Sequence, residues 1–247
     1  MLVVAVVLGL GLSIISQSTT DVRITQQEQD AARAFNAAEA GIEDALKQIT
    51  TVALGTPQLL NVDNVPVEYT VTGRDFLEMQ FKENESGQVI LDGTANTLTI
   101  EWVDKNSDEE NPNNCTGVSA ASGQTAASLL VNVIDNNYQT RRYGLNACAL
   151  SPSNNLTDVA QSGSDKYLRS YSVSIAAGDQ LMRVRPLYNL ASLRVTASNA
   201  LPTQAYLINS SAQVETKEAK AIEVTRLEPG TPSIFDYVLF SGGGLVK

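Results

Sequence analysis

The chain begins MLVVAVVLGLGLSIISQSTTDVRITQQEQDAARAFNAAEAGIEDALKQITTVAL (residues 1–54), a run that contains no proline. Beyond residue 16 this run is rich in alanine, glutamine, glutamate and leucine, which favour helix, and its only glycine there is Gly41. Residues 1–54 are therefore predicted to form one continuous helix, about 80 Å long at 1.5 Å per residue. A single domain of this size cannot bury a helix of that length along its whole extent.

The first part of the predicted helix is apolar on every face. Residues 1–16 carry no charge, their only polar side chains are Ser13 and Ser16, and the first charged residue is Asp21. A membrane-spanning helix needs about 20 apolar residues, so residues 1–20 are expected to lie in a membrane or against copies of themselves. The alternative is a core helix of a soluble protein. The side chains expected to be enclosed are Leu2, Val3, Val4, Val6, Val7, Leu8, Leu10, Leu12, Ile14 and Ile15.

The second part, residues 21–54, is amphipathic. Its apolar residues recur at spacings of three and four, which places them on one face of a helix; they are Phe35, Ala38, Ile42, Ala45, Leu46, Ile49 and Val52. This stripe is expected to dock on the rest of the chain, chiefly through Phe35, Ile42, Leu46 and Ile49. A helix stop is predicted near residue 55, where Gly55 is followed by Pro57.

From residue 55 to residue 247 the pattern changes to short runs rich in valine, isoleucine, threonine and tyrosine, separated by polar turn residues. Such runs predict β-strands; they cover 67–72, 77–82, 88–91, 97–103, 128–134, 167–175, 180–187, 191–196, 205–208, 221–226 and 234–240. The predicted fold class is α+β, with the long helix packed on a β-rich, mainly antiparallel head. A division of the head into two subdomains is expected near residues 151–163.

The composition excludes several classes of function. The chain has 247 residues, no histidine, two cysteines and a formal net charge of -10. Without histidine it cannot hold a Ser-His-Asp triad or a histidine-ligated metal. We expect no enzyme activity and no cofactor. The acidic balance and the lack of a Lys/Arg cluster argue against specific nucleic-acid binding, because phosphate contacts need such clusters.

One acidic loop offers a weak metal candidate. Asp104, Asn106 and Asp108 present oxygen ligands at alternate positions, as calcium loops do. The loop departs from the EF-hand pattern, because Glu109 stands where glycine is required and Cys115 stands where the bidentate glutamate should be. A solvated acidic loop is therefore the preferred interpretation, with calcium as the alternative.

One segment of the predicted helix, at its distance from the apolar start, resembles the N-terminal region of minor-pilin-X (PilX-like) proteins. Its sequence is Ala34-Phe35-Asn36-Ala37-Ala38-Glu39-Ala40-Gly41-Ile42-Glu43. The resemblance covers about the first 50 residues and identifies the chain as type IV pilin-like. Such proteins are made with a short basic leader that a prepilin peptidase removes. They reside in the inner membrane before the pilus assembly machinery adds them to an extracellular filament. Typical major pilins carry glutamate at the fifth mature position. If Met1 is the first mature residue, this chain has Ala5 there, which weighs against the major-subunit role.

Cys115 and Cys148 are expected to form a disulfide, because an even pair of cysteines in an exported chain favours one. Pilins often carry such a bridge, so the resemblance points the same way. Two buried free thiols are the alternative.

The resemblance implies a structural subunit of a cell-surface filament that polymerises with copies of itself. The apolar side chains of residues 2–15 would then form the filament core. Two other functions remain open: a minor or tip pseudopilin of a pilus or type II secretion system, and a membrane-tethered monomeric β-domain that acts as an adhesin or binding module.

Overall fold

The structure is a computed structural model, and it describes residues 2–93, 96–121, 123–164, 166–215 and 217–231. The side chains of residues 2–20 and 116–118 are not part of the description. The ten expected filament-core side chains and the predicted strand 234–240 therefore lie outside the described residues. The chain forms two compact units, one made of Met1–Gly73 and Tyr206–Arg226, the other of Arg74–Ala205 and Leu227–Lys247.

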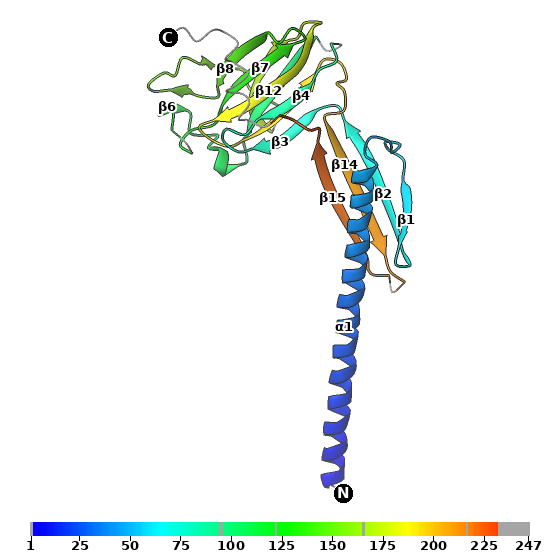
Figure 1. The fold of residues 1–247 in the computed structure, drawn as a ribbon. Helices are drawn as coiled ribbons and strands as arrows, with labels where there is room; N and C mark the ends of the chain where they lie inside the picture. Colours follow the sequence, from blue (N-terminus) through cyan, green and yellow to red (C-terminus); the bar gives the residue numbers. More distant parts are fainter. Residues whose placement is uncertain (1, 94–95, 122, 165, 216, 232–247) are drawn as a thin grey trace, which may run out of the picture. The chain divides into compact units, whose positions relative to one another are not determined.

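The first unit combines the long helix with a four-stranded sheet (Figure 1). Its elements are α1 (Leu2–Lys47), β1 (Gln58–Val62), β2 (Val65–Arg74), β14 (Ala205–Gln213) and β15 (Ala219–Leu227), and the strand order is β1-β2-β14-β15. β1 and β2 form an antiparallel hairpin whose two turn residues, Asp63 and Asn64, have φ of 48° and 64°. Two left-handed residues match the twist of a two-residue hairpin.

Helix α1 ends at Lys47, earlier than the predicted stop near residue 55. The residues after it, Ile49-Thr50-Thr51-Val52, are β-branched and have lower helix propensity. They form a turn in which the Gln48 carbonyl accepts hydrogen bonds from the Thr51 and Val52 amides, both at 2.8 Å. Gly55 has a φ of 75°, and its amide bonds the Val71 carbonyl at 2.8 Å, which starts the chain along the sheet.

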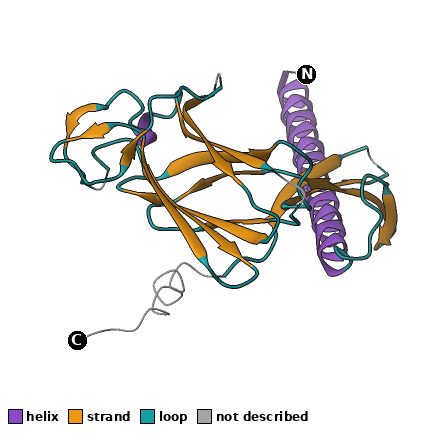
Figure 2. Ribbon diagram, turned by 90° about the horizontal axis from the view of Figure 1, so that it is seen from above, coloured by secondary structure: helices purple, strands orange, loops and turns teal. Residues whose placement is uncertain are grey.

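The second unit consists mostly of strands (Figure 2). One sheet has the order β10-β8-β7-β12-β4 and the other β11-β5-β13-β3. The elements are β3 (Leu77–Phe81), β4 (Gly87–Ile90), β5 (Thr97–Asp104), 3-10 helix η1 (Asp108–Glu110), β6 (Thr116–Val118), β7 (Ser128–Asp135), β8 (Thr140–Asn146), β9 (Ala149–Leu150), β10 (Thr157–Asp158), β11 (Tyr167–Ser174), β12 (Asp179–Leu187) and β13 (Ala191–Ala197). β6 pairs with β9 in a separate two-stranded sheet.

A single hydrophobic core joins the two larger sheets of this unit. It includes Trp102 from β5, Leu129 from β7, Met182 from β12 and Leu193 from β13, all fully buried. The Trp102 indole Nε1 donates a hydrogen bond to the Ala127 carbonyl at 3.0 Å, so its one polar group is satisfied. This unit is therefore a β-sandwich that folds around its own core.

The predicted fold class, a long N-terminal helix packed on a mainly antiparallel β-rich head, is confirmed. The two units divide the chain as follows. Residues 151–163 lie inside the second unit, and strands β1, β2, β14 and β15 belong with the helix. The sandwich is thus inserted between β2 and β14 of the first unit.

Candidate functional site

The C-terminal half of α1 covers one face of the first unit's sheet. Two hydrophobic clusters hold it there. The first joins Ala34, Ala37 and Ala38 to Val65, Val67, Ala212 and Val214; the second joins Ile42, Ala45 and Ile49 to Tyr69, Val71 and Ile208. In β2 the buried residues alternate with exposed ones, as expected for a strand with one covered face.

Three of the four residues expected to dock the helix lie in this contact. Ile42 and Ile49 are buried in the second cluster, and half-buried Leu46 packs against it. Phe35 does not lie there, because 47% of its side chain is exposed. One residue step turns a helix by about 100°, so the buried Ala34 directs Phe35 away from the sheet. The expectation for Phe35 is corrected: small alanines, not the phenylalanine, face the sheet at this level.

Gly41 marks the closest approach of helix and sheet. A Cβ atom at this position would lie 2.3 Å from Ser210 Oγ and 2.8 Å from Val67 Cγ1, which are distances that packed atoms do not adopt. Gly41 therefore allows the helix backbone to rest directly on β2 and β14. The sequence pattern shows a glycine at this position, but it does not predict that the glycine lies against β2 and β14.

A buried tyrosine joins the sheet to the helix by a polar contact. Tyr69 on β2 donates a hydrogen bond from its hydroxyl to Asp44 Oδ2 on α1 at 2.8 Å, and Gln48 Nε2 donates to the same oxygen at 2.8 Å. Burial, followed by the hydrogen bond to Asp44 and that residue's negative charge, raises the pKa of Tyr69 to about 12. Each effect disfavours the tyrosinate.

The Tyr69 contact predicts a specific alkaline transition. An unfolded tyrosine has a pKa near 10, so the stabilisation from Tyr69 is complete below about pH 10 and is lost as the pH rises toward about 12. In Tyr69→Phe the stability should fall less steeply between these pH values than in the wild type. Urea unfolding followed by far-UV circular dichroism at pH 8, 10 and 11 measures this. Tyr138→Phe is the control, and equal slopes for Tyr69→Phe and wild type would contradict the assignment.

The helix is uncovered toward its N-terminus. All residues from Asp21 to Gln29 are exposed, including the apolar Val22 and Ile24. Figure 1 shows α1 continuing beyond the sheet in this direction. Among the described side chains, those of residues 21–29 are therefore not covered by any other part of this unit.

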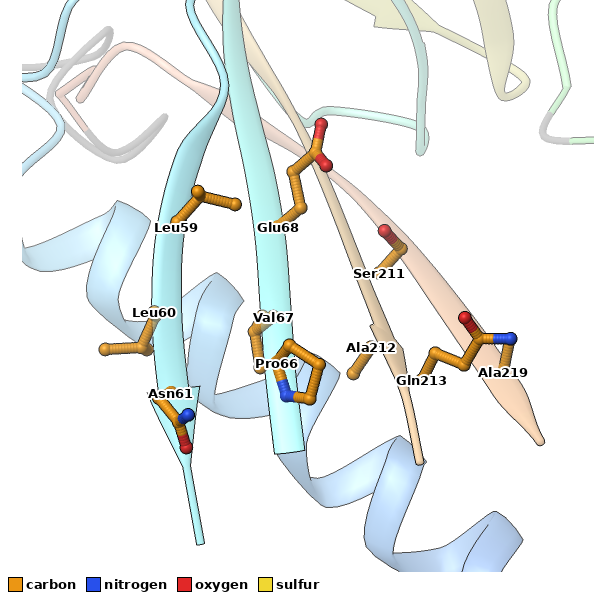
Figure 3. Close-up of a pocket in the computed structure, with 10 residues that line it drawn as sticks. All are labelled: Leu59, Leu60, Asn61, Pro66, Val67, Glu68, Ser211, Ala212, Gln213 and Ala219. Carbon is orange, nitrogen blue, oxygen red and sulfur yellow. The ribbon is translucent and has the colours of Figure 1, made fainter. Parts of the chain in front are cut away.

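The sheet of the first unit also carries a groove of about 630 Å³ beside β1, β2 and β14 (Figure 3). Its lining combines Leu60, Val67 and Ala212 from the helix-packed cluster with outward residues such as Leu59, which is 82% exposed. Glu68 is its one charged lining residue among the described residues. The groove thus offers an apolar packing surface and no arrangement of catalytic groups.

A ladder of charged side chains crosses the sheet of the second unit. Arg194 on β13 lies opposite Glu78 on β3 and Glu101 on β5. Its Nε donates to Glu101 Oε2 at 3.0 Å, and Tyr167 donates to Glu78 Oε1 at 2.9 Å. Burial alone would raise the pKa values of both glutamates, but hydrogen bonds outweigh it and hold both below their usual value of 4.5. These contacts tie the strands β3, β5, β11 and β13 together.

The predicted Cys115–Cys148 disulfide is present. Cys148 is buried in the sandwich core, and Cys115 packs against that core from the loop before β6. The bridge therefore fastens the segment between η1 and β6 to the sandwich.

The acidic loop 104–110 is built around a carboxylate that sequence reasoning missed. Glu110 is fully buried and accepts hydrogen bonds from the amides of Asp104 at 2.9 Å and Ser192 at 3.0 Å. Asp104 Oδ1 accepts from the Asn106 amide at 2.8 Å, so it closes a local turn. Among the described residues no group of three or more acidic or cysteine side chains could hold a metal ion.

The described side chains of α1 thus fall into an exposed stretch, residues 21–29, and a stretch from Ala34 onward that packs one face on the sheet. Residues 1–43 match the family model described as PilX N-terminal. The chain has a PilX-like N-terminal region, which relates it to the minor pilins of type IV pili, structural components of the pilus. No curated protein matches the chain. In the described part of the chain, no helix combines the length and apolarity that crossing a bilayer requires.

Proposed function

We propose that the chain is a non-enzymatic minor subunit of a type IV pilus-like filament on the cell surface. One observation carries the proposal: the PilX-like region, residues 1–43, lies on α1, whose described side chains are all exposed from residue 21 to residue 29, whereas one face of the helix packs on the sheet from Ala34 onward. A neighbouring pilin helix would cover the uncovered part. The apolar residues from Leu2 to Ile15 would extend that contact into the filament core.

The PilX-like match favours a minor subunit among other pilins over the homopolymer subunit that the sequence pattern first suggested. Helices that leave a bilayer keep an apolar environment only if other helices replace the lipid, and the gain then comes from close packing. The inner membrane, the prepilin peptidase and the assembly machinery are partners in this proposal. Quantitative mass spectrometry of sheared fibres measures the molar ratio of this chain to the most abundant pilin. We expect this chain to be the rarer component.

Placing a charge in the proposed core should remove the chain from fibres. Val4→Asp is expected to lower its amount in sheared fibres at least about tenfold, because a carboxylate in an apolar helix bundle costs several kcal/mol. Gln161→Asp, which adds the same charge at an exposed position of the second unit, outside the proposed helix contact, should leave the amount unchanged. Immunoblots of sheared fibres and of whole cells measure both. Val4→Asp chains found in fibres at the wild-type level would refute the core assignment.

A second candidate function is a binding module held at the surface, as a tip subunit or as a tethered monomer. The observation that favours it is the β-sandwich inserted between β2 and β14 with a core of its own. Assembly of the first unit does not require such an insertion. If immunogold microscopy finds the chain on the cell body and never on fibres, the tethered form is correct and the filament proposal is wrong.

A further inference from the structure

The hairpin between β7 and β8 displays a tyrosine at its tip. In the turn formed by Asn136, Asn137, Tyr138 and Gln139, all four residues are exposed, and Tyr138 is 84% exposed. Asp135 Oδ1 accepts hydrogen bonds from the amides of Asn137 and Gln139, both at 2.8 Å. The turn is also tied to the loop between β11 and β12, because the Asn136 amide donates to the Gly178 carbonyl at 2.9 Å. The tip is therefore held in a fixed conformation.

Tyr138 occupies a backbone position that does not suit tyrosine. Its φ is 61°, and its amide donates to the Asp135 carbonyl at 3.0 Å, which closes a turn followed by a left-handed residue. Glycine or asparagine is the usual residue at this place in a hairpin. Two other bulky residues of this unit share the conformation, but Val103 is fully buried and Tyr188 is half-buried, so packing explains them. No packing explains Tyr138. Residues kept in unfavourable conformations tend to serve recognition.

We propose that Tyr138 is the stacking platform of a saccharide-binding site at this end of the β-sandwich. The flat ring offers an apolar face to one side of a pyranose ring. The exposed amides of Asn136, Asn137 and Gln139 provide both donors and acceptors for the sugar hydroxyls. Because the turn is already fixed, little conformational freedom would be lost on binding.

The surroundings favour a saccharide over a protein partner. A protein interface has a contiguous apolar or aromatic core of several residues. In the described part of the second unit, the exposed large apolar side chains are Tyr138 and Met79, and Met79 lies on β3 of the other sheet. A single ring bordered by amides matches one sugar residue instead. This inference concerns the second unit alone and holds whether or not the chain enters a filament.

Retention on polysaccharides tests the proposal. The full chain, purified in a detergent without a sugar headgroup, is passed over cellulose, chitin and bead-bound mucin before and after enzymatic removal of the mucin glycans. We expect wild type and Tyr138→Phe to be retained on at least one sugar matrix. We expect Tyr138→Asn to be retained roughly tenfold less, the loss typical of one anchoring contact. Phe35→Ala, which changes an exposed aromatic residue of the first unit, should bind like wild type.

Tyr138→Asn is not expected to destabilise the fold, because asparagine adopts the left-handed conformation more readily than tyrosine, so a loss of binding would not be due to unfolding. The melting temperature of Tyr138→Asn should equal or exceed that of the wild type. The proposal is wrong if no sugar matrix retains the wild type, or if Tyr138→Asn is retained as well as the wild type. Retention on mucin that survives removal of its glycans, without retention on the other matrices, would point to a protein partner and would also overturn it.

Discussion

Removal of the Cys115–Cys148 bridge is expected to lower the free energy of unfolding of the β-sandwich by about 3–4 kcal/mol, the chain-entropy value for a loop of this size. The two cysteines are 33 residues apart, and the segment between them includes β6, β7 and β8. Without the bridge, the unfolded chain can separate these segments. The folded state keeps the same core. The variant of choice is Cys115→Ala/Cys148→Ala, because alanine leaves no buried hydroxyl at the position of Cys148.

The single tryptophan makes this measurement specific to one unit. Trp102 is fully buried in the sandwich core, so its fluorescence during denaturant titration follows unfolding of the second unit. Wild type in reducing buffer is the control and should unfold at the same denaturant concentration as the double alanine variant. If the free energy of unfolding fell by less than about 1 kcal/mol, the other contacts of the loop would be sufficient to hold it, and the role assigned to the bridge would be wrong.

The sequence was most informative where one local property governs the structure. The three-and-four spacing around Ile42 and the valine-, threonine- and tyrosine-rich run at residues 67–72 each reflect a local property of the chain, and they predicted helix and strand correctly. β8 was missed because Thr140-Arg141-Arg142-Tyr143-Gly144 shows no alternation. Its place in the sheet comes from pairing with β7, a contact that local pattern does not report.

Features that depend on distant partners could not be predicted. The acidic run around Glu110 predicts a solvated loop, yet this carboxylate is buried because the amides of Asp104 and Ser192 donate hydrogen bonds to it. The apolar stripe of the helix likewise predicted that Phe35 packs on the sheet, but the helix face that contacts the sheet there carries alanines. In both cases the competing effect is tertiary: a partner surface decides which of several plausible faces is covered.

A long-range pairing also builds the first unit, because β14 and β15 return to it about 130 residues after β2 leaves it, and local sequence pattern does not report such a pairing. The sheet of the first unit is built from strands that come before and after the inserted sandwich in the sequence. The two proposed roles can therefore be separated experimentally, because Val4 and Tyr138 belong to different units.

Gly41→Leu is expected to lower the stability of the first unit by about 3 kcal/mol, because a side chain there must displace either Ser210 and Val67 or the helix itself. Leucine is a better helix former than glycine by nearly 1 kcal/mol, so an isolated helix would gain from this change. A net loss must therefore come from the contact with the sheet. Thermal unfolding followed by helical circular dichroism reports on α1, whereas Trp102 fluorescence should show little change.

Two further variants assign the loss to this contact. Ala32→Leu places the same side chain at an exposed position of α1 and should leave the helical transition unchanged. Gly41→Ala adds only the Cβ atom that would lie 2.3 Å from Ser210 Oγ, so combining it with Ser210→Ala should recover part of its cost. A double variant that is no more stable than Gly41→Ala would mean that Ser210 is not the obstructing group. If Gly41→Leu raised the melting temperature, helix propensity would outweigh the contact, and α1 would not rest on β2 and β14 at this glycine.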